Sequence, residues 1–152
     1  TDDQGVHTTV YGATIRTCRV KTTYSTDKST NGAFAVNAAI STNIVNMFEA
    51  ANAAGITIGL TDGMRYTFSG GYTSQHPSGL AMDISISKGG NPICFNPEDN
   101  VGGWGDKDTA FRVCQQIGGA QFAAFQWLNE NAEKYGFYNY DPEPWHWSTS
   151  GK

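Results

Sequence analysis

Apolar residues recur at helical spacing in two stretches of the chain, and this pattern predicts its two main helices. The first stretch is Asn37–Ala54, which ends before Gly55 as many helices do. The second is Ala120–Tyr135, which has one apolar face and is followed by Gly136 as a C-cap. A shorter helix is expected at Asp106–Ile117, where a pair of glycines closes it.

Segments rich in β-branched residues predict the strands. Val10–Tyr24 is expected to form one or two strands, and Ile56–Leu60, Leu80–Ser87 and Phe137–Tyr140 one strand each. Residues 1–10 are polar and are expected to form a loose or edge arm. Strands at both ends with helices between them favour an α+β fold, in which a small antiparallel sheet carries helices packed mainly on one face.

The segment Leu80–Ser87 alternates apolar and polar residues, so its two faces should differ. One face would carry Asp83, Ser85 and Ser87, and the other would carry Met82, Ile84 and Ile86. The next segment, Lys88–Gly105, contains prolines and glycine pairs, and we interpret it as a long surface loop that covers or lines a cleft.

Size and charge narrow the class of protein. A chain of 152 residues is expected to form a single domain over residues 1–152, with residues 1–30 as N-terminal strands or an arm. The net charge of −4 argues against nucleic-acid binding. No apolar run approaches the length of about 18 residues that a membrane span needs. The chain begins at Thr1, which fits either a cleaved secretory signal or a trimmed expression product.

The three cysteines are Cys18, Cys94 and Cys114, and none belongs to a CxxC pair. A structural zinc knuckle is therefore not expected. Three disulfide pairings are possible, and the sequence does not choose among them or exclude the reduced state. We favour a bond between Cys94 and Cys114, because these two cysteines flank a glycine-rich loop that an oxidising compartment would allow them to close.

Two short segments carry residues suited to metal chemistry. Ser74–Asp83 contains His76 and Asp83, and Glu143–Trp147 contains Glu143 and His146. A catalytic zinc takes three protein ligands and keeps one position open, and a nearby carboxylate accepts the proton of the attacking water. We predict His76, Asp83 and His146 as the ligands and Glu143 as the base.

The prolines beside Glu143 disfavour a regular helix, so this segment is not the helical HExxH arrangement, which the sequence does not contain. In a fully extended chain Glu143 and His146 would point to opposite faces. The backbone must therefore bend if both residues serve one ion. In an extended Trp145–Trp147 segment, the two tryptophans share one face and His146 points to the other.

Together the two segments resemble the zinc D-alanyl-D-alanine carboxypeptidase family, the D,D-peptidases related to lysostaphin-type enzymes and hedgehog domains. The family's first motif, S-x-H-x-x-G-x-A-x-D, is matched by Ser74, His76, Gly79, Ala81 and Asp83. Its second, E-P-W-H, is matched by Glu143–His146. The resemblance extends over about residues 36–147. It implies a hedgehog-like α+β fold with one catalytic Zn²⁺ in a cleft on the sheet.

The resemblance also implies further roles. Arg65 occupies the place of a family arginine that engages the substrate carbonyl, although TDGMRY departs from the usual S-G-Y-R-S turn. Ser74 would bind the substrate backbone or support His76, and we expect Trp145 to contact the substrate. Tyr66, Tyr72 and Trp104 are further candidates for the rim of the site.

The expected activity is that of a zinc metallopeptidase acting on peptidoglycan stem peptides, with D-alanyl-D-alanine carboxypeptidase first. The alternatives are a D,D-dipeptidase, an L-alanyl-D-glutamate endopeptidase of the endolysin kind and a non-catalytic zinc-binding module. The presence of Glu143 argues against the last, because a binding module needs no base. The expected location is secreted or extracytoplasmic, at the cell wall, and the expected state is a monomer without nucleic-acid or membrane partners.

Overall fold

The computed structural model of the chain describes residues 2–20, 35–65, 74–86, 91–96 and 106–152. In chain order its elements are β1 (Asp2–Thr8), β2 (Thr14–Arg19), β3 (Ala35–Asn37), α1 (Ala38–Ala53), β4 (Gly59–Asp62), β5 (Ala81–Ser85), α2 (Lys107–Ile117), α3 (Gly119–Asn131), the 3-10 helix η3 (Ala132–Tyr135), β6 (Tyr138–Tyr140) and β7 (Glu143–Ser148). Within the described ranges, no helix is both long and apolar enough to cross a membrane.

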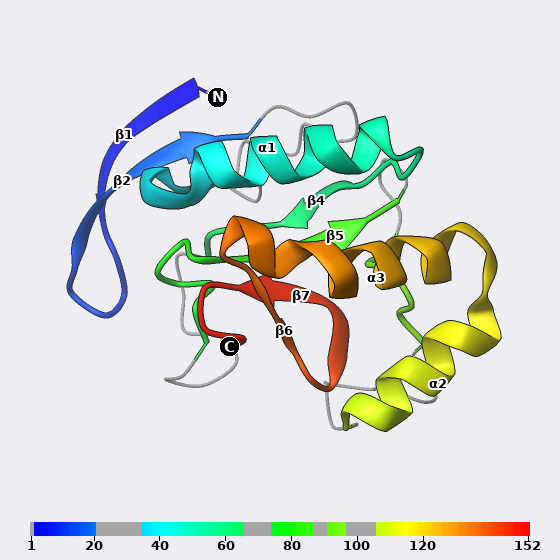
Figure 1. Cartoon of the computed structure of the whole chain (residues 1–152). Coiled ribbons are helices and arrows are strands. Elements are labelled where there is room, and N and C mark those ends of the chain that lie inside the picture. The colour runs from blue at the N-terminus through cyan, green and yellow to red at the C-terminus, as the bar shows by residue number, and fades with distance from the viewer. Residues whose placement is uncertain (1, 21–34, 66–73, 87–90, 97–105) are drawn as a thin grey trace.

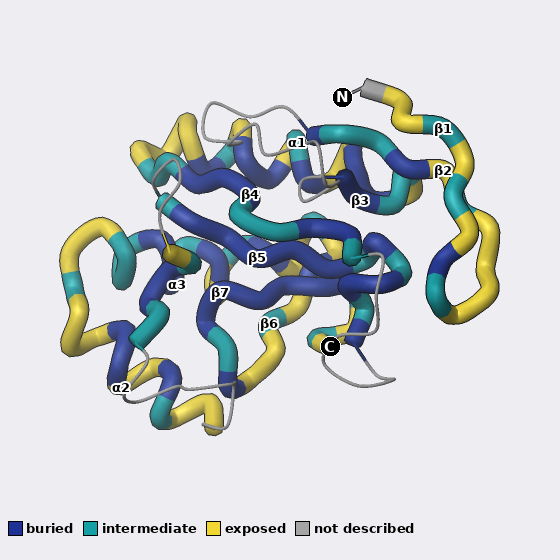
Figure 2. The backbone as a smooth tube through the Cα atoms, turned by 180° about the vertical axis from the view of Figure 1, so that it is seen from behind, coloured by how far each residue is buried: buried dark blue, intermediate teal, exposed yellow. Residues whose placement is uncertain are grey.

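The strands form two antiparallel sheets, one with the order β1-β2-β3 and one with the order β4-β5-β7-β6. Helices α1 and α3 cover one face of the four-stranded sheet (Figure 1). Seen from behind, the strands of this sheet lie in front of both helices (Figure 2). The predicted α+β class, with helices mainly on one face, is confirmed, but the strands divide into two sheets where we expected one.

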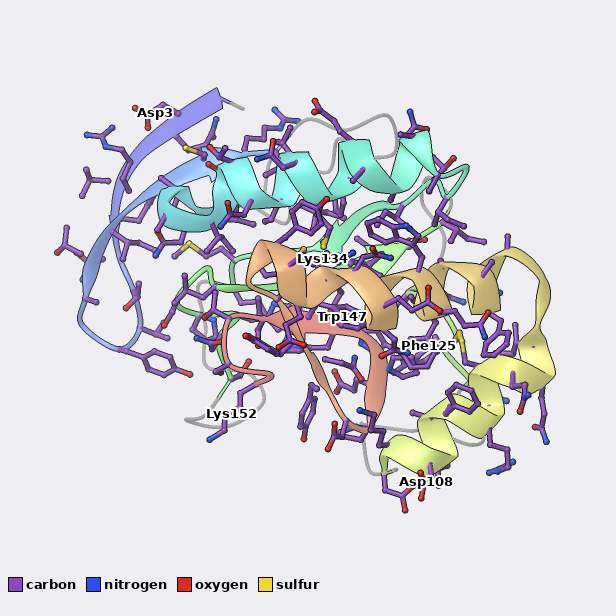
Figure 3. All side chains as sticks on the ribbon, in the orientation of Figure 1. Asp3, Asp108, Phe125, Lys134, Trp147 and Lys152 are labelled. Carbon is purple, nitrogen blue, oxygen red and sulfur yellow. A yellow bond between two sulfur atoms is a disulfide. The ribbon has the colours of Figure 1, made fainter. Side chains whose placement is uncertain are left out.

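The core lies between the helices and the four-stranded sheet. Phe125 of α3 and Trp147 of β7 are 1% and 2% exposed and point into this layer (Figure 3). Met82 and Ile84 of β5 belong to the same apolar cluster, as the alternation predicted. Because one face of β5 is committed to the core, the side chain of Asp83 points to the opposite face.

The three predicted helices are confirmed, with boundaries set by their caps. Helix α2 begins after Asp106, whose carboxylate accepts a hydrogen bond from the Thr109 N–H at 2.7 Å. Helix α3 continues into η3, and Gly136 follows as the predicted C-cap.

Of the alternatives expected for the N-terminal residues, strands are present and a loose arm is not, because Asp2–Thr8 form the edge strand β1 and pair with β2. The turn of this hairpin falls inside the stretch that we expected to begin a strand at Val10. It is closed by hydrogen bonds from the Thr9 N–H to the Ala13 carbonyl and from the Gly12 N–H to the Thr9 carbonyl, at 2.7 and 2.9 Å. Backbone pairing of this kind needs no apolar face, so the pattern of side chains gave no sign of it.

Two other boundaries differ from the prediction. Strand β4 starts at Gly59, three residues later than expected, because its pairing with β5 begins there. The described centre of the expected surface loop is buried, with Ile93 and Cys94 fully enclosed. The Ile93 N–H donates to the Ile84 carbonyl at 2.8 Å. The favoured Cys94–Cys114 disulfide is present, and it ties this segment to α2.

Candidate metal centre

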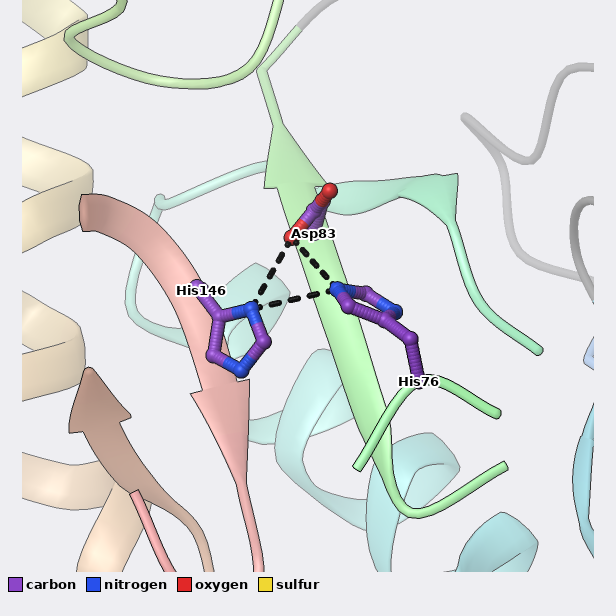
Figure 4. A group of neighbouring side chains, drawn as sticks. All are labelled: His76, Asp83 and His146. Atoms are coloured by element: carbon purple, nitrogen blue, oxygen red, sulfur yellow. Dashed lines mark hydrogen bonds and ion pairs between the residues drawn. The ribbon is translucent and has the colours of Figure 1, made fainter. Parts of the chain in front are cut away.

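Three buried side chains converge on the face of the four-stranded sheet that points away from α1 and α3 (Figure 4). His76 Nε2 lies 3.1 Å from Asp83 Oδ1 and 3.1 Å from His146 Nδ1. His146 Nδ1 lies 3.5 Å from Asp83 Oδ1. The structure therefore brings together the three residues that the sequence predicted as metal ligands.

The register of the sheet sets two of these residues side by side. Asp83 of β5 pairs directly with His146 of β7. Directly opposed residues in antiparallel strands point to the same face with Cβ atoms about 5 Å apart. Trp145 and Trp147 flank His146 and belong to the core cluster, so the alternation of β7 directs the imidazole away from the core.

His76 lies in the loop before β5, and contacts of its ring and its backbone hold it there. Its Nδ1 lies 2.7 Å from the Gly63 carbonyl oxygen, and its backbone N–H donates to Ser74 Oγ at 3.3 Å. Gly79 closes the loop with a φ of +70°, and a Cβ at this position would lie 2.6 Å from the Asn37 backbone nitrogen. A glycine is therefore favoured at this position by both the positive φ and the close approach of the Asn37 backbone.

The hydrogen bond to Gly63 fixes the tautomer of His76. A carbonyl oxygen only accepts, so Nδ1 carries the hydrogen and Nε2 of the neutral ring presents a lone pair to the cluster. That lone pair faces a carboxylate oxygen of Asp83 and a second imidazole nitrogen. Such a convergence of acceptors is favourable only with a proton or a cation among them.

The spacing of the three donor atoms fits zinc. Donors that sit about 2.0–2.1 Å from a tetrahedral ion lie about 3.3 Å from one another. The three distances here are 3.1, 3.1 and 3.5 Å. The donor set of two imidazole nitrogens and one carboxylate oxygen is also one that zinc accepts in catalytic sites. The residues therefore fit the ion without rearrangement.

Electrostatics within the cluster favour a charged Asp83. Burial raises the pKa of its carboxyl, but hydrogen bonds from His146 and His76 outweigh this and hold the pKa well below its ordinary value. Burial lowers the pKa of His76, but the hydrogen bond and the charge of Asp83 raise it above its ordinary value. Asp83 is thus ionised at neutral pH, at the point where a cation would bind.

Glu143 reaches the same cluster because strand β7 is bulged. Tyr140 of β6 pairs with Glu143, and Asn139 pairs with Trp147. Residues 144–146 of β7 therefore have no partner on β6. The Asn139 Nδ2 group spans this bulge by donating to the carbonyls of Glu143 and His146 at 2.9 and 3.0 Å. The bend that the sequence required is therefore present.

The bulge places Glu143 Oε2 3.7 Å from His146 Nδ1. The Glu143 side chain is 22% exposed, whereas those of the three predicted ligands are at most 8% exposed. Burial and the negative charge of Asp83 raise the pKa of Glu143, although His146 partly opposes the shift. A carboxylate with a raised pKa is a stronger base, and this one sits where solvent meets the cluster.

Arg65 lies on the other side of Asp83 and is held by a residue that sequence reasoning missed. Strand β4 sets Asp62 opposite Asp83. The guanidinium joins the two carboxylates, with Nη2 at 2.7 Å from Asp62 Oδ2 and at 3.4 Å from Asp83 Oδ2. Its side chain remains 31% exposed. The cation is therefore fixed next to the cluster with one side toward solvent.

The remaining predicted site residues differ in position. Ser74 is buried and its hydroxyl accepts from the His76 N–H, an arrangement that suits the supporting role. Trp145 is only 7% exposed and packs in the core against Phe95, so it offers a substrate little surface. The other predicted rim aromatics, Tyr66, Tyr72 and Trp104, lie outside the described residues.

Sequence reasoning also missed Tyr140. Its ring makes an edge contact with His146 at a centroid distance of 5.6 Å, and the residue is 38% exposed. Tyr140 therefore borders the cluster on the β6 side. Its place three residues before the E-P-W-H motif was visible in the sequence, but the bulge that turns it toward His146 was not.

Comparison with known proteins gives one family match. The model of the family described as VanY, D-alanyl-D-alanine carboxypeptidase, matches residues 68–152, which is more than half of the chain. The matched region contains the three clustered residues and Glu143, but Arg65 precedes it. No curated protein shows significant similarity to the chain.

Solved structures share the fold at low sequence identity. The LdcB LD-carboxypeptidase matches 87% of this chain with 19% identity and a TM-score of 0.58, and the chain spans 66% of its length. VanYB in complex with D-alanine-D-alanine matches 86% of this chain and 80% of its own, with 20% identity and a TM-score of 0.50. A Zn(II) complex of a VanY D,D-pentapeptidase variant also matches, at a TM-score of 0.49 with 19% identity over 86% of this chain and 82% of its own.

Proposed function

This chain belongs to the VanY D-alanyl-D-alanine carboxypeptidase family, and we propose that it is a zinc metallopeptidase that removes the terminal D-alanine from peptidoglycan stem peptides. The observation that carries the proposal is the triangle of donor atoms at 3.1, 3.1 and 3.5 Å. The family match supports it, because it covers every residue of that triangle.

His76, Asp83 and His146 would hold one Zn²⁺ through Nε2, Oδ1 and Nδ1. A zinc ion held by three protein ligands lowers the pKa of a water at its open position and polarises a substrate carbonyl. Asp83 contributes the negative charge of the site, and the Gly63 carbonyl keeps His76 in the tautomer that can bind a metal.

Glu143 would serve as the general base. Its carboxylate lies beside His146 and is partly open to solvent, so an attacking water can reach it. It would take a proton from that water and deliver it to the departing amine of D-alanine. The raised pKa of Glu143 suits both transfers, because the same group must accept the proton and then release it.

Arg65 would bind the substrate. Asp62 fixes its guanidinium, while part of the side chain faces solvent next to Asp83. A guanidinium forms charge-assisted hydrogen bonds to carboxylates and to oxyanions. In a carboxypeptidase it is suited to the terminal carboxylate or to the carbonyl oxygen of the bond that is cut.

The proposal also includes the extent of the domain, its location and its oligomeric state. We propose one peptidase domain over residues 1–152, because Val20 and Val36 of the N-terminal part share the core cluster with α1, α3 and β7. Peptidoglycan lies outside the cytoplasmic membrane, so the site of action would be extracytoplasmic, and the cleavage requires only a monomer.

Synthetic stem peptides test the function. We expect the zinc-loaded protein to release one D-alanine from a pentapeptide that ends in D-alanyl-D-alanine, as weighed by mass spectrometry. Cleavage only of a tetrapeptide would indicate an L,D-carboxypeptidase, and cleavage between L-alanine and D-glutamate would indicate an endopeptidase. Binding of zinc without cleavage of any peptide would indicate a non-catalytic module and contradict the proposal.

A further inference from the structure

The three clustered residues are not held in the same way. Asp83 and His146 are fixed by adjacent strands through their direct pairing. His76 lies outside the sheet, in a loop between Ser74 and Leu80. A loop can shift where paired strands cannot, so the position of His76 depends on what fastens that loop to the rest of the molecule.

Gln75 fastens this loop to the segment that directly follows β7. Its side-chain Oε1 accepts hydrogen bonds from the Ser150 N–H at 2.9 Å and from the Ser150 hydroxyl at 2.7 Å. Its Nε2 donates to Thr149 Oγ1 at 2.9 Å, and the same hydroxyl lies 3.2 Å from Oε1. Its backbone N–H donates to the Lys152 carbonyl at 3.2 Å. In Figure 1 the C-terminal end lies beside the segment that leads into β5.

The backbone of Gln75 also organises the loop itself. Its carbonyl accepts from the N–H groups of Ser78 and Leu80 at 3.2 and 3.1 Å. The Thr149 N–H donates in turn to the Leu80 carbonyl at 3.3 Å. Both ends of the loop are thereby joined to the chain that leaves β7 only a few residues after His146.

We propose that Gln75 is a positioning residue for the metal centre. By joining the His76 loop to residues 149–152, it holds His76 Nε2 at its distance of 3.1 Å from Asp83 Oδ1 and His146 Nδ1. The polar contacts of Gln75 thus join the loop that carries His76 to the segment that directly follows β7, the strand that carries His146. The inference rests on the proposed zinc site, but it concerns a residue that does not touch the ion.

The test is the zinc affinity of the metal-free protein, measured by competition with a chromophoric chelator. We expect Gln75→Ala to weaken zinc binding by about 10- to 100-fold, the range typical of residues that orient metal ligands. Gln126→Ala makes the same chemical change on the exposed face of α3 and should leave the affinity unchanged. A Gln75→Ala affinity within about twofold of the wild type would overturn the proposal.

A second variant keeps the test valid if Gln75→Ala does not fold. Thr149→Val preserves the shape of the side chain but removes its hydroxyl contact with Gln75, and it should weaken zinc binding by about 10-fold or less. The weakening expected for Thr149→Val is at least about twofold, and an affinity within about twofold of the wild type in the folded variant would overturn the proposal. Folding of each variant is checked by circular dichroism without zinc.

Activity at different zinc concentrations separates positioning from substrate contact. Excess zinc should restore peptide hydrolysis by Gln75→Ala, because the defect lies in occupancy of the site. A defect that persists at saturating zinc would contradict the positioning role. Failure of the wild-type protein itself to bind zinc would contradict the proposed function, and this outcome is distinct from failure of the inference.

Discussion

The two sheets of this molecule are built from the same kind of antiparallel pairing but differ in how deeply they bury charged residues. In the four-stranded sheet every residue of β5 is buried, including Asp83 and Ser85. In the three-stranded sheet only Thr17 of β2 is buried, and the other residues of this strand are exposed or half-buried. Its ion pair between Arg16 and Asp3 lies at the surface, with both side chains more than half exposed.

This difference concerns the free-energy cost of burying a charged side chain, which applies to Asp83 and not to Asp3 or Arg16. Burying a charged side chain is unfavourable unless partners compensate, and paired surface charges contribute little. Asp83 is compensated by two imidazoles and Arg65, whereas Asp3 and Arg16 remain in water. We therefore expect substitutions in the polar cluster to change zinc binding and activity, and matched substitutions in the three-stranded sheet to change little.

The three-stranded sheet also contacts the loop that carries His76. The Asn37 N–H at the end of β3 donates to the Gly79 carbonyl at 2.8 Å. The Tyr11 hydroxyl of the β1–β2 turn donates to the Ser74 carbonyl at 3.0 Å. The three-stranded sheet thus supports the His76 loop from outside while contributing no group to the cluster.

The largest expected effect comes from a pair of histidine variants. His146→Ala removes one of three ligands and should abolish stoichiometric zinc binding, as measured by elemental analysis after dialysis. His7→Ala removes a half-buried imidazole of β1 that lies outside the cluster, and it should retain one zinc per chain. Equal zinc content in the two variants would contradict the claim that the four-stranded sheet carries the zinc site and the three-stranded sheet does not.

A pair of glutamate variants separates chemistry from metal binding. Glu143→Gln should lower hydrolysis of a D-alanyl-D-alanine peptide by about 10²- to 10⁴-fold, the range for loss of a general base. Its zinc content should stay at the wild-type value, because Glu143 is not a ligand. Glu133→Gln, on the exposed side of η3, serves as the control. Full activity of Glu143→Gln would exclude Glu143 as the base.

Arg65 and Arg16 form the third pair. Arg65→Ala should lower kcat/KM by about 10- to 100-fold, the loss of a hydrogen bond to a charged group. Arg16→Ala removes a surface ion pair and should leave kcat/KM unchanged and the free energy of unfolding within about 1 kcal/mol. Steady-state kinetics and urea unfolding measure the two effects. A wild-type kcat/KM in Arg65→Ala would exclude the substrate role.

Two glycine variants compare the sheets by stability alone. Gly79 and Gly12 both have positive φ, but only at Gly79 would a Cβ meet another backbone atom within 4 Å. Gly12→Ala should therefore cost about 1 kcal/mol of unfolding free energy through strain. Gly79→Ala should cost about 2–4 kcal/mol, because the contact with Asn37 adds to that strain. Equal losses in urea unfolding would show that the close packing at Gly79 is unimportant.

The sequence predicted the parts of the fold that local patterns control. The helices followed from apolar periodicity and from caps such as Asp106 and Gly136. The alternation around Asp83 correctly separated its core face from its polar face. For the N-terminal residues the sequence left strands and an arm as alternatives, because the pairing of β1 with β2 is made by backbone groups in a polar segment.

The residues of the candidate site also fall into two groups, those that the sequence predicted and those that it did not. His76, Asp83, Glu143 and His146 were predictable because each belongs to a short motif with recognisable chemistry. Asp62 and Gln75 were not, because their importance lies in contacts with residues distant in sequence. Trp145 was expected to contact the substrate, but the alternation of β7 that directs His146 toward the cluster places this tryptophan in the core.

The most direct test is X-ray anomalous scattering from zinc-loaded crystals, recorded on both sides of the zinc absorption edge. The account predicts one zinc peak per chain, at about 2.0–2.2 Å from His76 Nε2, Asp83 Oδ1 and His146 Nδ1. A peak bound by other residues, or no peak at this triangle at saturating zinc, would contradict the account.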